Sequence, residues 1–264
     1  MTAPASLGPA ATPEDLARRA EEACFAAWPA PREVLMDGWL LRFAGGHTSR
    51  ANSVNIVGPS REGAAGKLAA CDALYRAQGL RPILRLSSAQ PQADLAPALD
   101  AAGYGPPRDA SLVLHADIGP SRHDAGGATL AEGRPDLAWR AASDAAAGLD
   151  GTGAAWRERI LDSFAVPVAF ASVAVAGEVA ATALGAVHGG LVCLNAVATD
   201  PRHRGRGLAA RAVSALLAWA AERQGATGAC LQVDAGNAPA LALYGRLGFA
   251  AELSRYHYRD APRP

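Results

Sequence analysis

A glycine- and arginine-rich stretch is the part of this chain whose composition points most directly to chemistry. Between Ala198 and Ala212 it carries four arginines and two glycines, and it separates an apolar run from an Ala/Leu-rich run. The first turn of a helix has unpaired backbone N–H groups and a partial positive charge, and glycines let an anion approach them closely. The stretch therefore predicts a phosphate-binding loop at a helix N-terminus, with Arg202, Arg204 and Arg206 as cationic partners.

Other interpretations of this stretch fit the chain less well. A flexible linker is disfavoured because a strand leads into the loop and an amphipathic helix leads out of it. Lys+Arg and Asp+Glu both number 25, so the chain has no net charge to attract nucleic acid or an anionic membrane, and we expect neither as a partner. No Lys-Ser/Thr pair follows the glycines, which excludes a P-loop.

The elements expected around the loop alternate between strands and helices, which favours an α/β fold with a mixed sheet. Glycines and a proline break the apolar region 164–199 into short pieces, so we interpret it as three strands and not as a membrane span. Gly225 is expected to end the helix that follows the loop. The predicted helices are 134–147, 154–164, 208–223 and 238–247, and the predicted strands are 169–175, 180–187, 191–199, 229–235 and 252–259.

A second motif follows the strand after that helix, and it reads AGNAPALALYGRLGF. The two motifs together resemble those of the GNAT superfamily of acetyl-CoA-dependent N-acetyltransferases. The family's V-x-P-x-x-R-G-x-G segment stands here as residues 199–207, with Thr199 in place of valine. Its N-x-x-A-x-x-L-Y-x-x-L-G-F segment stands as residues 237–249 without a departure. The resemblance covers residues 127–260 and implies the GNAT acyl-CoA N-acyltransferase fold.

The resemblance also implies where acetyl-CoA, the cosubstrate, is bound. The backbone of Val197, Ala198 and Thr199 is expected to hold the pantetheine arm like an added strand, and an N–H near Val197 to polarise the thioester carbonyl. The pyrophosphate motif fits in two registers, starting at Arg204 or at Arg202, and we prefer the first. The expected cofactor-binding residues are Val197, Ala198, Thr199, Arg204, Gly205, Arg206, Gly207, Leu208, Ala209 and Asn237, and no metal is expected.

Two residues are expected to act in catalysis. Tyr244 matches the family's usual general acid, which protonates the coenzyme A thiolate; alternatively it is an aromatic residue of the core. Asn195 is expected to orient a water or the substrate, because an amide cannot accept a proton at neutral pH. The general base is left open between His188, Glu158, Asp200 and a chain of waters.

The acceptor is expected to be an amine of a small molecule or a peptide. Family substrates generally lie between the first helices and the last strands of the domain, which here points to Trp156, Glu158, Tyr256 and Tyr258. In the first half of the chain, Arg50, Asn52 and Asn55 surround a short strand, where they either line a shared cleft or cap loops.

The first half of the chain repeats part of the second. Two helix-ending glycines are 24 residues apart in the first half and 23 apart in the second, which suggests a duplicated unit; they are Gly79 and Gly103, and Gly225 and Gly248. The whole chain also resembles bacterial proteins with two GNAT units in tandem. We therefore expect a degenerate GNAT-like domain without the cofactor loop at 1–122 and a catalytic domain at 123–264, joined by a linker near 118–129.

The cysteines and the N-terminus indicate the cellular context. The four cysteines are far apart in the sequence without the spacing of a metal site, and we expect reduced, buried thiols. Cys193 and Cys230 lie in apolar strands with no basic neighbour to lower a thiol pKa, so an acetyl-cysteine intermediate is not expected. The N-terminus lacks a basic region followed by an apolar block, which favours a cytoplasmic protein. A homo-oligomer is left open.

The sequence thus predicts an enzyme that transfers an acetyl group from acetyl-CoA to a primary amine by direct attack in a ternary complex. One alternative is a non-catalytic sensor that binds coenzyme A or an acyl-CoA and does not depend on Tyr244. A second is a dinucleotide-binding oxidoreductase, because Gly205, Gly207 and Ala210 fit G-x-G-x-x-A and Asp234 ends the next strand, where a ribose-binding acid belongs.

Overall fold

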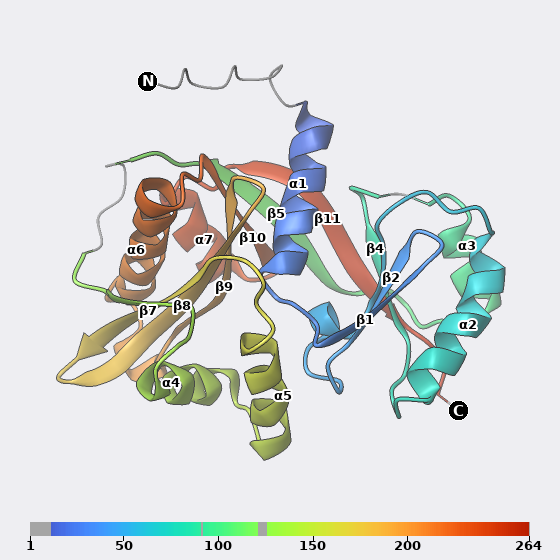
Figure 1. The fold of residues 1–264 in the computed structure, drawn as a ribbon, viewed down its shortest axis with the longest axis horizontal. Coiled ribbons are helices and arrows are strands. Elements are labelled where there is room, and N and C mark those ends of the chain that lie inside the picture. Colours follow the sequence, from blue (N-terminus) through green and yellow to red (C-terminus); the bar gives the residue numbers. More distant parts are fainter. Residues whose placement is uncertain (1–11, 91, 121–125, 264) are drawn as a thin grey trace.

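The computed structural model describes residues 12–90, 92–120 and 126–263, and there eleven strands form one sheet with helices on both faces (Figure 1). None of the described helices is long and apolar enough to cross a membrane. The helices are α1 (Pro13–Ala26), α2 (Ala64–Arg76), α3 (Leu95–Ala101), α4 (Leu137–Ala147), α5 (Gly151–Leu161), α6 (Leu208–Arg223) and α7 (Ala238–Arg246), with the 3-10 turns η1 (Ser49–Ala51) and η2 (Pro201–His203). The strands are β1 (Arg32–Met36), β2 (Trp39–Phe43), β3 (Val54–Ile56), β4 (Ile83–Ser87), β5 (Arg108–Asp117), β6 (Thr129–Glu132), β7 (Val168–Val175), β8 (Glu178–His188), β9 (Leu191–Thr199), β10 (Gly228–Asp234) and β11 (Ala251–Asp260).

The two halves of the chain are joined through an exchange of their last strands. The order in the sheet is β1-β2-β3-β4-β11-β5-β10-β9-β8-β7-β6, so β11 follows the first-half strands and β5 follows the second-half ones. These two strands cross the centre of the molecule side by side (Figure 1). Among the described strands only β3 with β4 and β9 with β10 run parallel, so the sheet is mixed. The predicted domain boundary after residue 122 falls in 121–125, outside the described residues.

Three apolar cores hold the helices to this sheet. The core under α6 and α7 includes Leu194, Leu216 and Tyr244, and a second core under α1, α4 and α5 includes Trp139 and Leu184. The third lies under α2 and α3, on strands β2 to β4. Although α1 is the first helix of the chain, it packs on β8, β9, β10 and β11, which belong to the second half. The first half therefore covers part of the second half's sheet.

Most of the predicted elements are confirmed, and the shifted ones have local causes. The helix predicted at 208–223 and the strand predicted at 191–199 have the predicted bounds. The helices predicted at 134–147 and 154–164 begin instead at Leu137 and Gly151. In each case an aspartate fixes the start, because Asp136 Oδ1 accepts a hydrogen bond from the Trp139 N–H and Asp150 Oδ1 accepts one from the Gly153 N–H, both at 2.7 Å.

A buried ion pair ties α1 to the centre of the sheet. Glu21 on α1 accepts hydrogen bonds from both terminal nitrogens of Arg85 on β4, at 2.6 and 3.0 Å. The same carboxylate accepts bonds from the hydroxyls of Ser87 and Ser254, at 3.2 and 3.3 Å. Four donors from two strands thus satisfy one buried charge, which is the condition under which such a pair is tolerated in a core.

A close contact also joins α5, in the second half of the chain, to Gly45 in the first half. Gly45 has a φ of +59°, and a Cβ built on it would overlap the indole of Trp156. Trp156 also lies under Arg159, with 4.4 Å from the guanidinium carbon to the ring centroid. The indole therefore fits against bare backbone, and only glycine leaves room for it at position 45.

Gly45→Ala is expected to destabilise the protein by about 1–3 kcal/mol more than Gly46→Ala, because only the first change forces a methyl group into the Trp156 ring. Gly46 is a matched control: its φ is +87°, and its added Cβ would meet only Leu80 Cδ2 at an ordinary 3.7 Å. Urea unfolding of both variants measures the difference. Equal losses of unfolding free energy in the two variants would contradict the packing of Trp156 on Gly45.

Candidate functional site

The arginine- and glycine-rich loop connects β9 to the start of α6. Gly205 and Gly207 both adopt left-handed backbone conformations, with φ of +76° and +73°. Gly207 is the residue that caps α6, and it has no side chain to bind the N–H groups of the first turn. A Cβ built on either glycine would meet no atom within 4 Å. The start of α6 therefore presents uncapped amides to open space, as an anion-binding loop requires.

The three arginines expected to bind phosphate differ in their surroundings. Arg202 donates to both carboxylate oxygens of Asp200, at 2.7 Å to Oδ2 and 3.2 Å to Oδ1. Arg206 Nη1 lies 3.0 Å from His203 Nδ1. Within the described residues Arg204 has no ion-pair partner, so it is the arginine most available to an external anion.

The parallel pairing of β9 with β10 is short. Residues 191–194 of β9 pair with 228–231 of β10, but both strands continue beyond that point. β10 stays paired with β5 on its other side as far as Asp234. The edge of β9 that faces β10 is therefore unpaired over residues 195–199, and this unpaired segment is called the β9–β10 slot below. It contains the predicted pantetheine-binding residues Val197, Ala198 and Thr199.

A bulge in β9 lies within the slot. Thr182 pairs with Ala198 and Leu184 pairs with Asn195, so two β9 residues stand opposite the single residue between them on β8. One of the two, Ala196, has a φ of +50°. A bulge of this kind takes backbone groups out of the regular ladder and turns them to a new direction. Val197 is the second residue of this bulge, and its N–H is the group predicted to polarise a carbonyl.

Tyr244 lies on α7 with its ring buried and its hydroxyl available. Its ring packs edge-on against Phe249, with 5.8 Å between the ring centroids. Its hydroxyl has no hydrogen-bond partner in the part of the chain that the structure describes. Burial raises the pKa of Tyr244 to about 12, opposed in part by the charge of Arg50. The hydroxyl is thus protonated at neutral pH and can donate a proton, and the ring also belongs to the core as the alternative interpretation expected.

Asn195 joins the two halves of the chain at the slot. Its Oδ1 accepts a hydrogen bond of 2.6 Å from Arg50 Nη1, and its Nδ2 donates one of 3.3 Å to the carbonyl of Ala27. The Arg50 backbone is fixed in turn by the buried Arg42, whose Nη1 donates to the Arg50 carbonyl at 3.0 Å. Asn195 is therefore placed to position Arg50, a contact that the sequence did not predict.

A small polar cavity of about 210 Å³ opens beside Arg50. Residues from four places in the sequence meet there because β5 and β11 have changed places in the sheet. Its lining is Thr48, Ser49, Arg50, Asp109, Ser111, Gln232, Asp234, Tyr256 and Tyr258. Of the expected acceptor residues, Tyr256, Tyr258 and Arg50 therefore come together in one cavity.

The other expected acceptor residues lie elsewhere. Trp156 packs on Gly45, and Glu158 forms an ion pair with Arg140. Asn52 caps a loop, because its Oδ1 accepts bonds from the N–H groups of Ala44 and Gly46 at 2.8 and 2.9 Å. Asn55 is buried and donates to the Ser53 carbonyl. Asp109, Ser111 and Gln232 of the cavity were missed, since no local pattern indicates that β5 joins β10.

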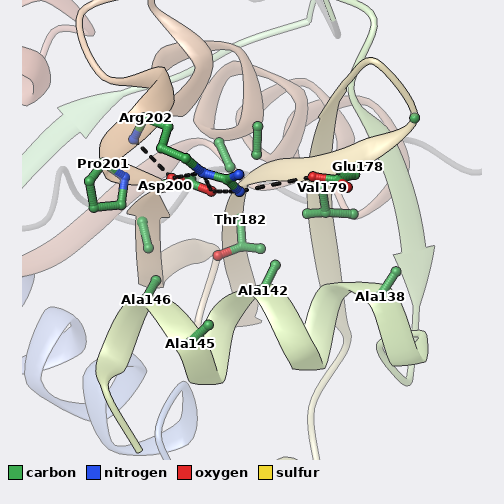
Figure 2. Close-up of a pocket in the computed structure, with 14 residues that line it drawn as sticks. Ala138, Ala142, Ala145, Ala146, Glu178, Val179, Thr182, Asp200, Pro201 and Arg202 are labelled. Carbon is green, nitrogen blue, oxygen red and sulfur yellow. Dashed lines mark hydrogen bonds and ion pairs between the residues drawn. The ribbon is translucent and has the colours of Figure 1, made fainter.

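A second cavity, of about 420 Å³, adjoins the loop on the α4 side of the sheet. Figure 2 shows its alanine-lined wall on α4, including Ala142 and Ala145, facing Thr182. The Arg202–Asp200 pair closes the opposite side, with Glu178 at 3.9 Å from the arginine. The β9 end, at Ala198, thus has free space on the α4 side.

The residues considered as a general base are poorly suited to that role. Hydrogen bonds from Arg202 lower the pKa of Asp200 to about 2, which makes it a weak base. His188 is exposed at the end of β8, and Glu158 is paired with Arg140.

Asn237 and Asp234, considered above as ligand-binding residues, both bond to nearby backbone. Asn237 caps α7, accepting a bond of 3.2 Å from the Ala240 N–H, and Asp234 accepts one of 2.7 Å from the Gly236 N–H.

Comparison with known proteins identifies relatives of this chain. The family described as "Probable histone acetyltransferase Rv0428c C-terminal" matches residues 16–259. A GCN5-related N-acetyltransferase from Kribbella flavida is 18% identical, with 97% of this chain and 98% of that one covered and a TM-score of 0.65. A putative GNAT-family acetyltransferase from Novosphingobium aromaticivorans is 20% identical, with 91% and 97% covered and a TM-score of 0.56.

A third solved structure is a tandem GNAT protein from the clavulanic acid biosynthesis pathway. It is 14% identical, with 80% of this chain and 76% of that one covered and a TM-score of 0.55. No curated protein matches this chain. At such low identity the three structures establish the fold alone, and it is the GNAT fold predicted from the two motifs.

Replacing Arg202 with glutamine is expected to raise the pKa of Asp200 from about 2 toward its ordinary value of about 3.9, because the ion pair that favours the carboxylate is lost. Carbon-detected NMR titration of the aspartate side chains measures this. Asp37 is the internal control: backbone N–H groups of Glu62 and Arg61 hold its pKa at about 2, so it should not change. An unchanged pKa of Asp200 would refute the ion pair between Arg202 and Asp200.

Proposed function

This chain belongs to the Rv0428c C-terminal acetyltransferase family, and on that basis we propose that it transfers the acetyl group of acetyl-CoA to a primary amine. The observation that carries the proposal is the β9–β10 slot, which leads directly into the uncapped start of α6. An extended chain that ends in a phosphate group matches this arrangement. Coenzyme A has that form, with an amide-containing arm joined to a pyrophosphate.

The residues along this path fit acetyl-CoA, which supplies the acetyl thioester. The open edge of β9 at Val197 and Thr199 offers backbone hydrogen bonds to an extended arm. The first amides of α6, at Leu208 and Ala209, are directed at an anion, and Arg204 adds a charge. Gly205 and Gly207 keep that approach clear of side chains.

Tyr244 supplies the proton that the reaction needs. The acceptor nitrogen forms a bond to the acetyl carbon as the carbon–sulfur bond breaks, and the departing thiolate takes the hydroxyl proton of Tyr244. The proton lost by the amine passes to water, from which the tyrosine is reprotonated. A backbone N–H at Val197 stabilises negative charge on the carbonyl oxygen. No side chain is assigned as base, and the amine reacts in its neutral form.

We further propose that the acceptor amine occupies the small cavity beside Arg50. That cavity offers one cation and two carboxylates, Asp109 and Asp234, to a polar acceptor. In this proposal the first half is a degenerate GNAT unit in tandem with the second, because Leu99 stands where the second half has Tyr244. Its contribution is Arg50 and the exchanged strand β5, which form part of the cavity wall.

Gly207→Trp is expected to weaken acetyl-CoA binding by at least about 100-fold, because the indole takes the place of the phosphate and two or more charge-assisted hydrogen bonds are lost. Gly225→Trp is the matched control: it lies beyond the other end of α6 with a φ of +66° and open space around it. Isothermal titration with acetyl-CoA, coenzyme A and NAD measures both variants. Binding of NAD alone by the unaltered protein would support a dinucleotide oxidoreductase instead.

Tyr244→Phe is expected to leave acetyl-CoA affinity within about twofold while turnover falls about 100-fold or more, because only the proton donor is removed. Tyr104→Phe is the control, a buried tyrosine of the first half whose pKa is also raised by burial. Thiol release with a panel of amines measures turnover. Equal rates in the two variants would return Tyr244 to a packing role, and binding without turnover of any amine would support the sensor.

A further inference from the structure

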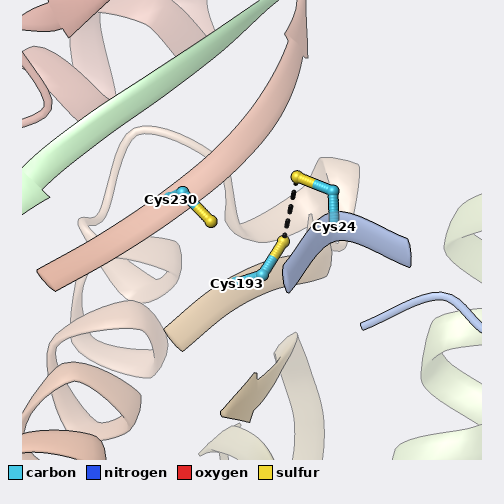
Figure 3. A group of neighbouring side chains, drawn as sticks. All are labelled: Cys24, Cys193 and Cys230. Atoms are coloured by element: carbon cyan, nitrogen blue, oxygen red, sulfur yellow. Dashed lines mark hydrogen bonds between the residues drawn. The ribbon is translucent and has the colours of Figure 1, made fainter. Parts of the chain in front are cut away.

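Three of the four cysteines come together in the core between the halves. The sulfur atoms of Cys24, Cys193 and Cys230 all lie within 4.8 Å of one another, and all three residues are buried. Figure 3 shows their side chains directed toward a common point from α1, β9 and β10. The cysteines are unbonded, in agreement with the predicted thiols. Their grouping was not predicted, because 36 or more residues separate any two of them in the sequence.

The register of the sheet explains the cluster. Cys193 and Cys230 are direct partners in the parallel pair of β9 and β10, so their side chains leave the same face of the sheet next to each other. α1 packs on that face and supplies Cys24, whose sulfur lies 3.6 Å from that of Cys193. Three rigid elements therefore fix the three sulfurs, and no loop residue takes part.

Polar side chains also lie beside the cluster. Asn195 Nδ2 is 3.8 Å from the Cys193 sulfur, and Asn195 Oδ1 accepts a hydrogen bond from Arg50 Nη1. The expectation that Cys193 has no basic residue nearby was wrong in three dimensions, because Arg50 of the other half lies on the far side of Asn195.

We propose that Cys24, Cys193 and Cys230 form a three-coordinate binding site for Cu(I). Thiolates are the ligands that select soft ions such as Cu(I). A structural zinc site requires four ligands, and an iron–sulfur cluster generally four cysteines, whereas within the described residues this group contains only three metal-binding side chains. Each sulfur that becomes a ligand releases its proton to solvent, and no electron is transferred.

Such an ion would tie α1 to the sheet at the mouth of the slot. The pair of Cys193 and Cys230 is followed by a single further pair, Leu194 with Leu231, before β9 and β10 cease to pair. Cu(I) bound there would hold the last paired residues together and anchor the first half to them. Binding is therefore expected to raise the melting temperature of the protein as well as to occupy the site.

The test begins with the reduced full-length protein under anaerobic conditions, titrated with Cu(I) against a chromophoric competitor such as bicinchoninate. About one ion per chain should be withdrawn from the competitor, and X-ray absorption should show sulfur ligands only. Zn(II), tested in parallel, should bind more weakly. Failure to compete, or nitrogen and oxygen ligands on the bound copper, would overturn the proposal without the use of any variant.

Single replacements then assign the ligands. Cys24→Ala, Cys193→Ala and Cys230→Ala should each weaken Cu(I) binding by more than about 100-fold, beyond the range seen for loss of an outer-shell partner. Cys71→Ala is the matched control, since Cys71 is an equally buried cysteine of α2 outside the cluster. Circular dichroism verifies that each variant is folded. An equal loss of Cu(I) affinity in the Cys71 variant, or no loss of affinity in the other three, would show that the cluster is only three packed thiols.

Discussion

The parallel pairing of β9 with β10 ends after four residue pairs, and the candidate site depends on that limit. Beyond it each strand continues with a partner on its outer side alone, β9 with β8 apart from the bulge and β10 with β5 as far as Asp234. The bulge at Ala196 then turns part of the open edge of β9 away from the regular ladder. At the end of this edge the chain enters a glycine-rich turn and starts α6 without a capping side chain. One topological constraint thus places an open strand edge and free helix amides next to each other along the chain.

The exchange of β5 and β11 makes the first half necessary to this arrangement. Without β5, β10 would be an edge strand of its half. The same exchange brings Arg50 to Asn195 and places residues of both halves around one small cavity. Glu21 with Ser254 and Trp156 against Gly45 then fix the halves at two further points. The first half thus contributes residues to the candidate site.

The features that the sequence predicted are those encoded by neighbouring residues. The glycine-containing loop before a helix, the bounds of 208–223 and 191–199 and the GNAT fold all follow from local motifs and periodicity. The sequence placed the starts of two helices wrongly. They begin at Leu137 and Gly151, because in each case one aspartate cap outweighs the helix propensity of the neighbouring residues. The exchanged strands, the Arg50–Asn195 bond and the three-cysteine cluster were not predicted, because each joins segments far apart in the chain. Such pairings are set by tertiary packing, which one sequence does not reveal.

Hydrogen exchange at the backbone amides of residues 195–199 tests the central claim, that the β9–β10 slot receives acetyl-CoA. Exchange in this segment is expected to slow at saturating acetyl-CoA, because an added arm would pair with the open edge of β9. The amides of β3, which like β9 has a parallel neighbour in the described sheet, are the control and should be unaffected. Unchanged exchange at 195–199 with ligand fully bound would place the binding elsewhere and contradict the account.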